Sequence, residues 1–223
     1  MKRKSNFVFG ITLLALVVAA CSPATPTSPS PIESGPILST PTATTAVTVS
    51  STVTGMDPSL ACAGGKTSAS PTVELTEGPY YKSGSPEQAN VYQDGMTGTK
   101  LVVSGYVYDT NCQPVANAWL DFWQADANGV YDNNGYTLRG HQYTDATGHF
   151  ELTTVVPGIY PGRTEHIHVK VQAPNGQVIT SQLFFPGVSQ NDADGIYDSS
   201  LLLAIQETGN GLQGQFNFVV PAQ

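Results

Sequence analysis

The chain has 223 residues, with 9 basic and 17 acidic side chains and a formal net charge of −8. A surface this acidic argues against nucleic acid as a partner, because affinity for nucleic acids comes largely from Lys and Arg on phosphates. The charge balance is instead that of a soluble exported domain.

Residues 1–20 have the composition of a targeting segment. Lys2, Arg3 and Lys4 are basic, and the almost wholly apolar run that follows is shorter than the roughly 20 residues of a transmembrane helix. Small residues stand directly before Cys21, as they do in bacterial lipoprotein signals. We therefore expect Cys21 to be lipidated; the alternative is an ordinary secretory signal that ends near a cysteine. Lipidation predicts an extracytoplasmic protein, anchored to a bacterial membrane or cell surface, whose only membrane contact is the N-terminal lipid.

Residues 21–71 are dominated by Ser, Thr, Pro and Ala and contain no aromatic side chain. Such a stretch buries too little apolar surface to offset the entropy lost on ordering, so we interpret it as a tether. After Cys21, the remaining cysteines are Cys62 and Cys112. Export permits a disulfide between them, and two unpaired thiols are the alternative, because sequence separation does not give the Cα distance that a disulfide requires.

From residue 72 to residue 223, short β-rich segments alternate with turn signals. Turns are expected at 109–114 and 143–148, and no segment keeps a helical period over ten residues. Several short strands at regular spacing predict an all-β fold, a β-sandwich of mostly antiparallel strands. Trp119 and Trp123 are expected to be core or structural residues. The expected strands are 101–108, 118–124, 149–153, 166–171, 178–185 and 214–220.

A pair of histidines, His166 and His168, falls in one of these strands. Residues two apart on a strand point to the same face, so both imidazoles project together, as they do in many metal sites. Such a pair also arises by chance, and alone it is a weak indication. His141 and His149 have no such partner and are interpreted as turn or surface residues.

Two tyrosines stand in turns near this pair. Tyr160 lies in the segment Pro-Gly-Ile-Tyr-Pro, and Tyr131 follows a turn at Asn128 and Gly129. A phenol with a pKa near 10 is a poor ligand for most divalent metals, but a trivalent ion stabilises the phenolate. Two phenolates, a hydroxide and two neutral imidazoles suit Fe(III) better than zinc. Ordinary core tyrosines are the alternative, and Tyr136 is interpreted as a pocket-rim or packing residue.

Six segments occur here in the order and spacing of a known family. Over roughly residues 72–220 the chain resembles the intradiol ring-cleavage dioxygenases, which include the catechol 1,2-dioxygenases and protocatechuate 3,4-dioxygenases. The resemblance implies one mononuclear non-haem Fe(III) ion, a catechol-type substrate and O2. The segments are 76–81, 123–131, 138–140, 144–150, 157–161 and 163–168, and the implied iron ligands are Tyr131, Tyr160, His166 and His168.

The same resemblance implies roles in catalysis. Tyr160 matches the axial ligand that substrate displaces, Arg163 matches a residue that stabilises charge on the substrate ring, and Gln182 matches a pocket glutamine. Tyr80 and Tyr81 match a segment at the substrate entrance, so together with Arg163 they are expected to contact substrate. The implied reaction inserts both atoms of O2 into the ring, between its two hydroxylated carbons, and gives a muconate-type diacid.

The chain also departs from the cytoplasmic members of that family. It lacks their helical N-terminal dimerisation region and their longer insertion before the histidines, since only five residues separate Tyr160 from His166. Neither the substrate nor the oligomeric state follows from the sequence. The motifs of residues 144–150 and 157–160 also occur in metal-free transthyretin-like and carboxypeptidase-regulatory-like β-sandwiches, so a surface binding module is the alternative. Tyr131 and the histidine pair, which such modules do not require, favour the enzyme.

Overall fold

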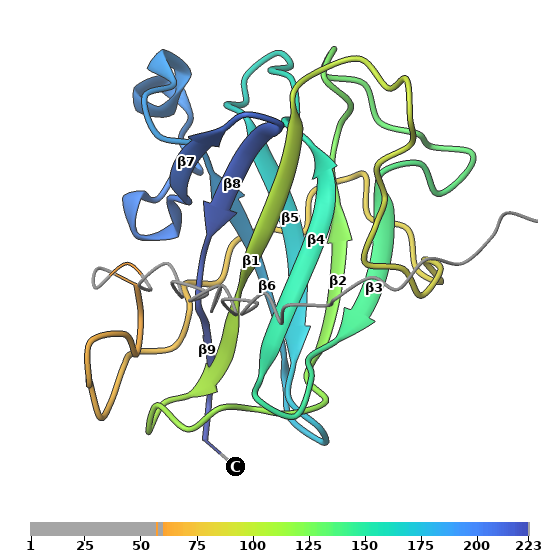
Figure 1. Ribbon diagram of the computed structural model, residues 1–223. Coiled ribbons are helices and arrows are strands. Elements are labelled where there is room, and N and C mark those ends of the chain that lie inside the picture. The colour runs from red at the N-terminus through yellow and green to blue at the C-terminus, as the bar shows by residue number, and fades with distance from the viewer. Residues whose placement is uncertain (1–56, 58–59, 223) are drawn as a thin grey trace, which may run out of the picture. The chain divides into compact units, whose positions relative to one another are not determined.

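The computed structural model describes residue 57 and residues 60–222 (Figure 1). The predicted signal segment, Cys21 and most of the predicted tether lie outside these residues. Within the described part of the chain, no helix has the length and apolar character needed to cross a membrane.

Two β-sheets stack face to face, which confirms the predicted sandwich (Figure 1). Neighbouring strands are antiparallel, except that β8 and β9 run parallel to β1. The first sheet has the order β4-β1-β8-β7, with β9 also paired to β1, and the second has the order β3-β2-β5-β6. The bounds are β1 (Lys100–Asp109), β2 (Trp119–Trp123), β3 (Arg139–Tyr143), β4 (His149–Val155), β5 (His166–Gln172), β6 (Val178–Phe184), β7 (Ala204–Thr208), β8 (Gly211–Gln215) and β9 (Phe218–Val220), with short 3-10 helices η1 (Ser189–Ala193) and η2 (Ser199–Leu201).

The strand period of two residues decides what lies between the sheets. Strand β5 turns Ile167, Val169 and Val171 into one continuous apolar core with side chains of the opposite sheet, such as Leu101 and Val103 of β1. The alternate residues of β5 therefore project from the outer face of the second sheet. The candidate site is built on that outer face.

The structure differs from the predicted strands in two places. Strand β3 was not expected, because its inward positions are Gly140 and Gln142 and give no apolar alternation. The expected strand 214–220 is divided into β8 and β9. The backbone of Phe216 passes so close to Gly105 that a Cβ there would lie 1.7 Å from its carbonyl oxygen, and Asn217 accepts a hydrogen bond from the Tyr106 amide.

Cys62 and Cys112 form a disulfide, with Cα atoms 5.3 Å apart. It joins the segment that begins at residue 60 to the turn after β1. Nearby, Leu60 and Ala63 are buried, and Asn217 donates a hydrogen bond to the carbonyl of Ala61. Although the domain boundary at residue 72 stays a prediction, the chain already contacts the sandwich about ten residues earlier.

We expect the double variant Cys62→Ser/Cys112→Ser to lose about 2–4 kcal/mol of unfolding free energy, because the crosslink closes a loop with a sequence separation of 50. Urea denaturation of the parent and the variant measures the difference. A reducing agent should destabilise the parent and leave the variant unchanged. Equal stability of the two proteins without reductant would show that the crosslink does not stabilise the fold.

Candidate metal and substrate site

The candidate site lies where β2 ends and β5 begins, on the outer face of the second sheet. His168 is paired in register with Trp123 on one side and with Gln182 on the other, so the three side chains form a row across three strands. The Trp123 indole stacks on the His168 imidazole, with 4.7 Å between ring centroids and 7° between planes. The sheet thus sets the position of His168, and the Trp123 indole packs flat against one face of its imidazole.

All four predicted metal ligands come together at this row. The Nε2 atoms of His166 and His168 lie 3.1 Å apart, and the hydroxyl of Tyr131 lies 3.4 Å from Nε2 of His166. The ring of Tyr160 is 5.6 Å from that of His166 and 5.8 Å from that of Tyr131, between centroids. Among the described residues, no group of three or more His, Cys, Asp or Glu is placed to hold a metal, so a metal site here depends on the tyrosines.

The histidines are held in the form that a metal requires. Nδ1 of His166 lies 2.6 Å from the carbonyl oxygen of Thr164. Because a carbonyl only accepts, Nδ1 carries the proton and Nε2 directs its lone pair into the cluster. Burial, reinforced by the positive charge of Arg163, lowers the pKa of His166 to about 4. Burial, together with the nearby His166 imidazole, also lowers the pKa of His168 well below its usual value. Both imidazoles are therefore neutral at pH 7.

The pKa values of the two phenols shift in the opposite direction, upward. Burial, together with the neighbouring Tyr160 hydroxyl, strongly raises the pKa of Tyr131. Burial also raises the pKa of Tyr160, against the opposing influence of Arg163. Both phenols are therefore protonated without a bound cation, and only a strongly charged ion would remove their protons. Two neutral imidazoles and two ionisable phenols fit Fe(III), which is hard and prefers anionic oxygen.

Arg163 and Gln182, both predicted as site residues, contact each other and the cluster. The guanidinium of Arg163 donates to Oε1 of Gln182 and, at 3.5 Å, to the hydroxyl of Tyr160. Gln182 in turn donates to the carbonyl of Thr76 at 2.9 Å. These bonds fix a positive group beside Tyr160, at the edge of the cluster.

Asp194 orients Arg163 but was not predicted from the sequence. One carboxylate oxygen accepts from Nε of Arg163 and from the Thr164 amide, each at 2.9 Å, and the other accepts from the Ile196 amide. Burial disfavours the carboxylate, but the bonds from the two amides and Arg163 outweigh it and lower the pKa of Asp194. Because Asp194 lies about 30 residues after Arg163 in an irregular segment, no local pattern indicates the contact.

Tyr80 and Tyr81 separate in the structure. The ring of Tyr80 stacks on that of Tyr131, with 4.3 Å between centroids, and meets Tyr160 edge-on at 6.1 Å. Tyr81 instead donates to Asp121 and packs against Trp123. Tyr80 therefore covers the phenols, whereas the hydroxyl of Tyr81 is directed away from the four predicted ligands.

Arg139 contacts the same region from β3, and no role in the site was predicted for it from the sequence. It is almost fully buried and donates to the carbonyls of Tyr80 and Asp132, with its guanidinium carbon 5.9 Å from the centre of the Tyr131 ring. The family-like segment 138–140 contains it, but that pattern assigns it no role. Tyr136 lies outside the cluster, since its hydroxyl donates to the carbonyl of Ser83.

Comparison with known proteins agrees with this geometry. Residues 76–218 match the sequence profile of the family described as Dioxygenase, which covers more than half of the chain. The chain therefore belongs to the intradiol ring-cleavage dioxygenase family.

Three relatives show the extent of the similarity. The 6-chlorohydroxyquinol 1,2-dioxygenase of Cupriavidus pinatubonensis is 26% identical over 171 residues, which are 64% of this chain and 62% of that enzyme. The dioxygenase domain of a dioxygenase carbohydrate-binding protein fusion from Streptomyces sp. SirexAA-E is 47% identical, with a TM-score of 0.68, over 69% of this chain and 100% of that domain. An intradiol ring-cleavage dioxygenase from Tetranychus urticae is 27% identical, with a TM-score of 0.63, over 69% and 95% of the two chains.

The similarity to the curated enzymes is partial. The matched part of the chain spans between about half and three fifths of the length of the curated dioxygenases to which it is similar. Their activities are therefore a basis for a proposal about this chain rather than an assignment.

The pKa of His166 predicts how the stability of the metal-free protein depends on pH. The imidazole has a pKa near 6.5 when unfolded and about 4 when folded, so the unfolded state binds the additional proton between these values. Unfolding free energy should therefore fall as pH drops from about 6.5 to about 4, with His166 contributing up to about 1.4 kcal/mol per pH unit. Urea denaturation at several pH values measures this slope.

His149 of β4 provides the matched control for this slope, because it lies outside the cluster and is only half-buried. His166→Gln should flatten the dependence between pH 6.5 and 4, and His149→Gln should leave it steep. Equal slopes in the two variants would mean that His166 is not buried in its neutral form.

Proposed function

We propose that the chain is an Fe(III)-dependent intradiol dioxygenase that cleaves a catechol-type ring with O2. One observation carries the proposal: two phenols and two neutral imidazoles converge on a rigid sheet face, with Nε2 of His166 directed into the group. A metal-free binding module has no need of that arrangement. The proposed ligands are Tyr131, Tyr160, His166 and His168.

The surrounding residues suit the chemistry of an anionic aromatic substrate. A bound ferric ion would supply the Lewis acidity and redox capacity that allow a catechol to react with O2. Tyr160 is half-buried, and its phenolate, once formed, would take a proton from a substrate hydroxyl. Arg163, held by Asp194 and Gln182, directs positive charge to the same place and would stabilise negative charge on the ring. Tyr80 would form one wall of the substrate site.

The proposal extends to where the reaction occurs. We propose that the protein is exported and held at a bacterial membrane or cell surface by a lipid on Cys21. The Cys62–Cys112 disulfide supports export, because disulfides persist in oxidising compartments and are rare in the cytosol.

Tyr131→Phe tests the ligand set. Fe(III) bound to tyrosinate absorbs visible light, so the iron-reconstituted protein should be coloured and the variant should lose most of the colour. Ring-cleaving turnover should fall by roughly 100-fold or more, as expected when a principal group of an active site is removed. Absorption spectra, iron content and oxygen uptake measure the three effects.

Tyr136→Phe is the matched control, because Tyr136 is a nearby tyrosine whose hydroxyl bonds to Ser83 outside the cluster. It should retain both colour and turnover. A parent protein that stays colourless after iron reconstitution would contradict the enzyme proposal and favour a metal-free module. Loss of colour in Tyr136→Phe alone would show that the wrong tyrosine was chosen.

A further inference from the structure

The face that carries the candidate site continues to an open aromatic row at its other end. Trp119 of β2 is paired in register with Tyr143 of β3 and with Gln172 of β5. Cross-strand partners on one face lie about 5 Å apart, so the three side chains form a row roughly 10 Å long across the sheet. This row is the counterpart of the row that Trp123, His168 and Gln182 form at the site.

The two rows differ in what covers them. Trp123 is 1% exposed because Tyr81 packs on it, whereas Trp119 is only partly buried and Tyr143 is 50% exposed. Both tryptophans were expected to be core or structural residues; Trp123 is buried, whereas Trp119 is only partly buried and lies on the outer face of the sheet. The chain leaves an indole and a phenol in contact with solvent, although burying such rings is strongly favourable. An open aromatic pair of this kind indicates a binding surface.

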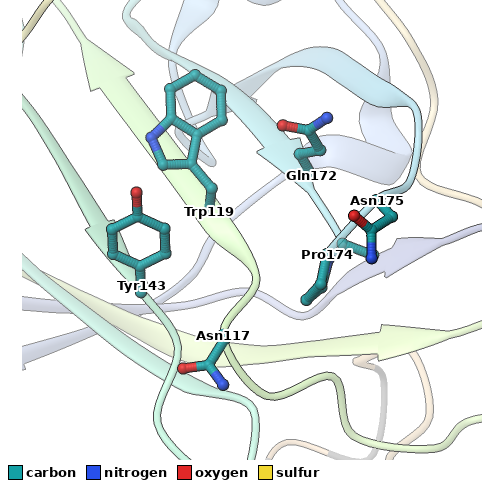
Figure 2. A pocket seen from close by; sticks show the side chains of 7 residues that line it. Asn117, Trp119, Tyr143, Gln172, Pro174 and Asn175 are labelled. Atoms are coloured by element: carbon teal, nitrogen blue, oxygen red, sulfur yellow. The ribbon is translucent and has the colours of Figure 1, made fainter.

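The row forms one wall of a surface hollow of about 680 Å³ (Figure 2). Figure 2 shows the rings of Trp119 and Tyr143 side by side, with Asn117 beneath them and Gln172 and Asn175 across from them. His141, in the next row of the same face, continues the aromatic surface, since its ring lies 6.4 Å from Trp119 and 6.0 Å from Tyr143. The hollow is lined by Asn117, Trp119, Tyr143, Gln172, Ala173, Pro174 and Asn175.

The lining carries no charged side chain, although the chain as a whole has a net charge of −8. Its polar groups are the amides of Asn117, Gln172 and Asn175, each of which offers both donors and an acceptor. One donor of Gln172 is already directed at the Gly176 carbonyl, at 2.9 Å, which fixes that side chain. An anion or a cation would find no countercharge here, and a wholly apolar ligand would leave the amides without partners.

Aromatic rings beside uncharged amides complement one class of ligand. A pyranose ring presents a flat face of C–H groups that stacks on an aromatic ring, and its edge carries hydroxyls that both donate and accept hydrogen bonds. The geometry points to a binding site for a neutral, pyranose-based polysaccharide on this hollow, with Trp119 and Tyr143 as the stacking platform and the amides as hydrogen-bond partners.

This site is separate from the candidate metal site. Trp119 and Trp123 are four positions apart on β2, a distance of about 13 Å along the strand. Tyr81 crosses the face between them, where it bonds to Asp121 and packs over the ammonium group of Lys170 at 4.4 Å. A polysaccharide held on the hollow would thus lie on the same face as the site without entering it. The inference does not require the proposed function.

Affinity electrophoresis and calorimetry of the full chain test the inference, with cellohexaose, xylohexaose and mannohexaose as neutral probes and polygalacturonate as the charged comparison. At least one neutral probe should bind. Tyr143→Ala should weaken that binding at least tenfold, and because Tyr143 is exposed the variant should remain folded. Trp119→Ala should have a similar or larger effect. Tyr106→Ala, which removes a partly exposed tyrosine from the outer face of the other sheet, should bind like the parent.

Three results would overturn the inference. The first is no binding of any neutral probe by the parent protein. The second is binding that Tyr143→Ala and Trp119→Ala leave unchanged. The third is stronger binding of polygalacturonate than of every neutral probe, which would assign the hollow to a charged ligand. None of these measurements depends on iron, so they fail or succeed separately from the dioxygenase proposal.

Discussion

The central constraint of this molecule is the two-residue period of strand β5. It turns Ile167, Val169 and Val171 into the core and leaves His166 and His168 on the outer face. A slip of one residue in its pairing would exchange the two sets, burying imidazoles between the sheets and exposing aliphatic side chains. The apolar core therefore fixes the register, and the register fixes both imidazoles at the candidate site.

Burial then gives the site its electrostatic character. The segment that contains Tyr80 and Tyr81 covers this part of the outer face, so His166, His168 and Tyr131 are buried, Tyr160 is half-buried, and all four favour their neutral forms. Arg163 is the positive group at its edge, and Asp194 holds it from outside the cluster. A neutral, preorganised donor set beside one oriented cation suits a multivalent metal and an anionic substrate.

The sequence predicted the parts of this structure that have local signatures. The histidine pair, Tyr131 and Tyr160 stand in short motifs, and the structure brings them together. It left the Cys62–Cys112 pairing open and missed Asp194, because both depend on contacts between segments distant in the chain. Strand β3 and the partial burial of Trp119 depend on neighbouring strands and on where Tyr81 lies, which no single segment encodes.

The most direct measurement of the central proposal is the fate of the two atoms of dioxygen. The iron-loaded full chain is incubated with ¹⁸O2 and each of catechol, protocatechuate and hydroxyquinol, and the products are analysed by mass spectrometry. Intradiol cleavage predicts a ring-opened diacid that carries both labelled atoms for at least one substrate. No oxygen consumption with any of the three by a coloured, iron-bound protein, or a product with a single labelled atom and an intact ring, would contradict it.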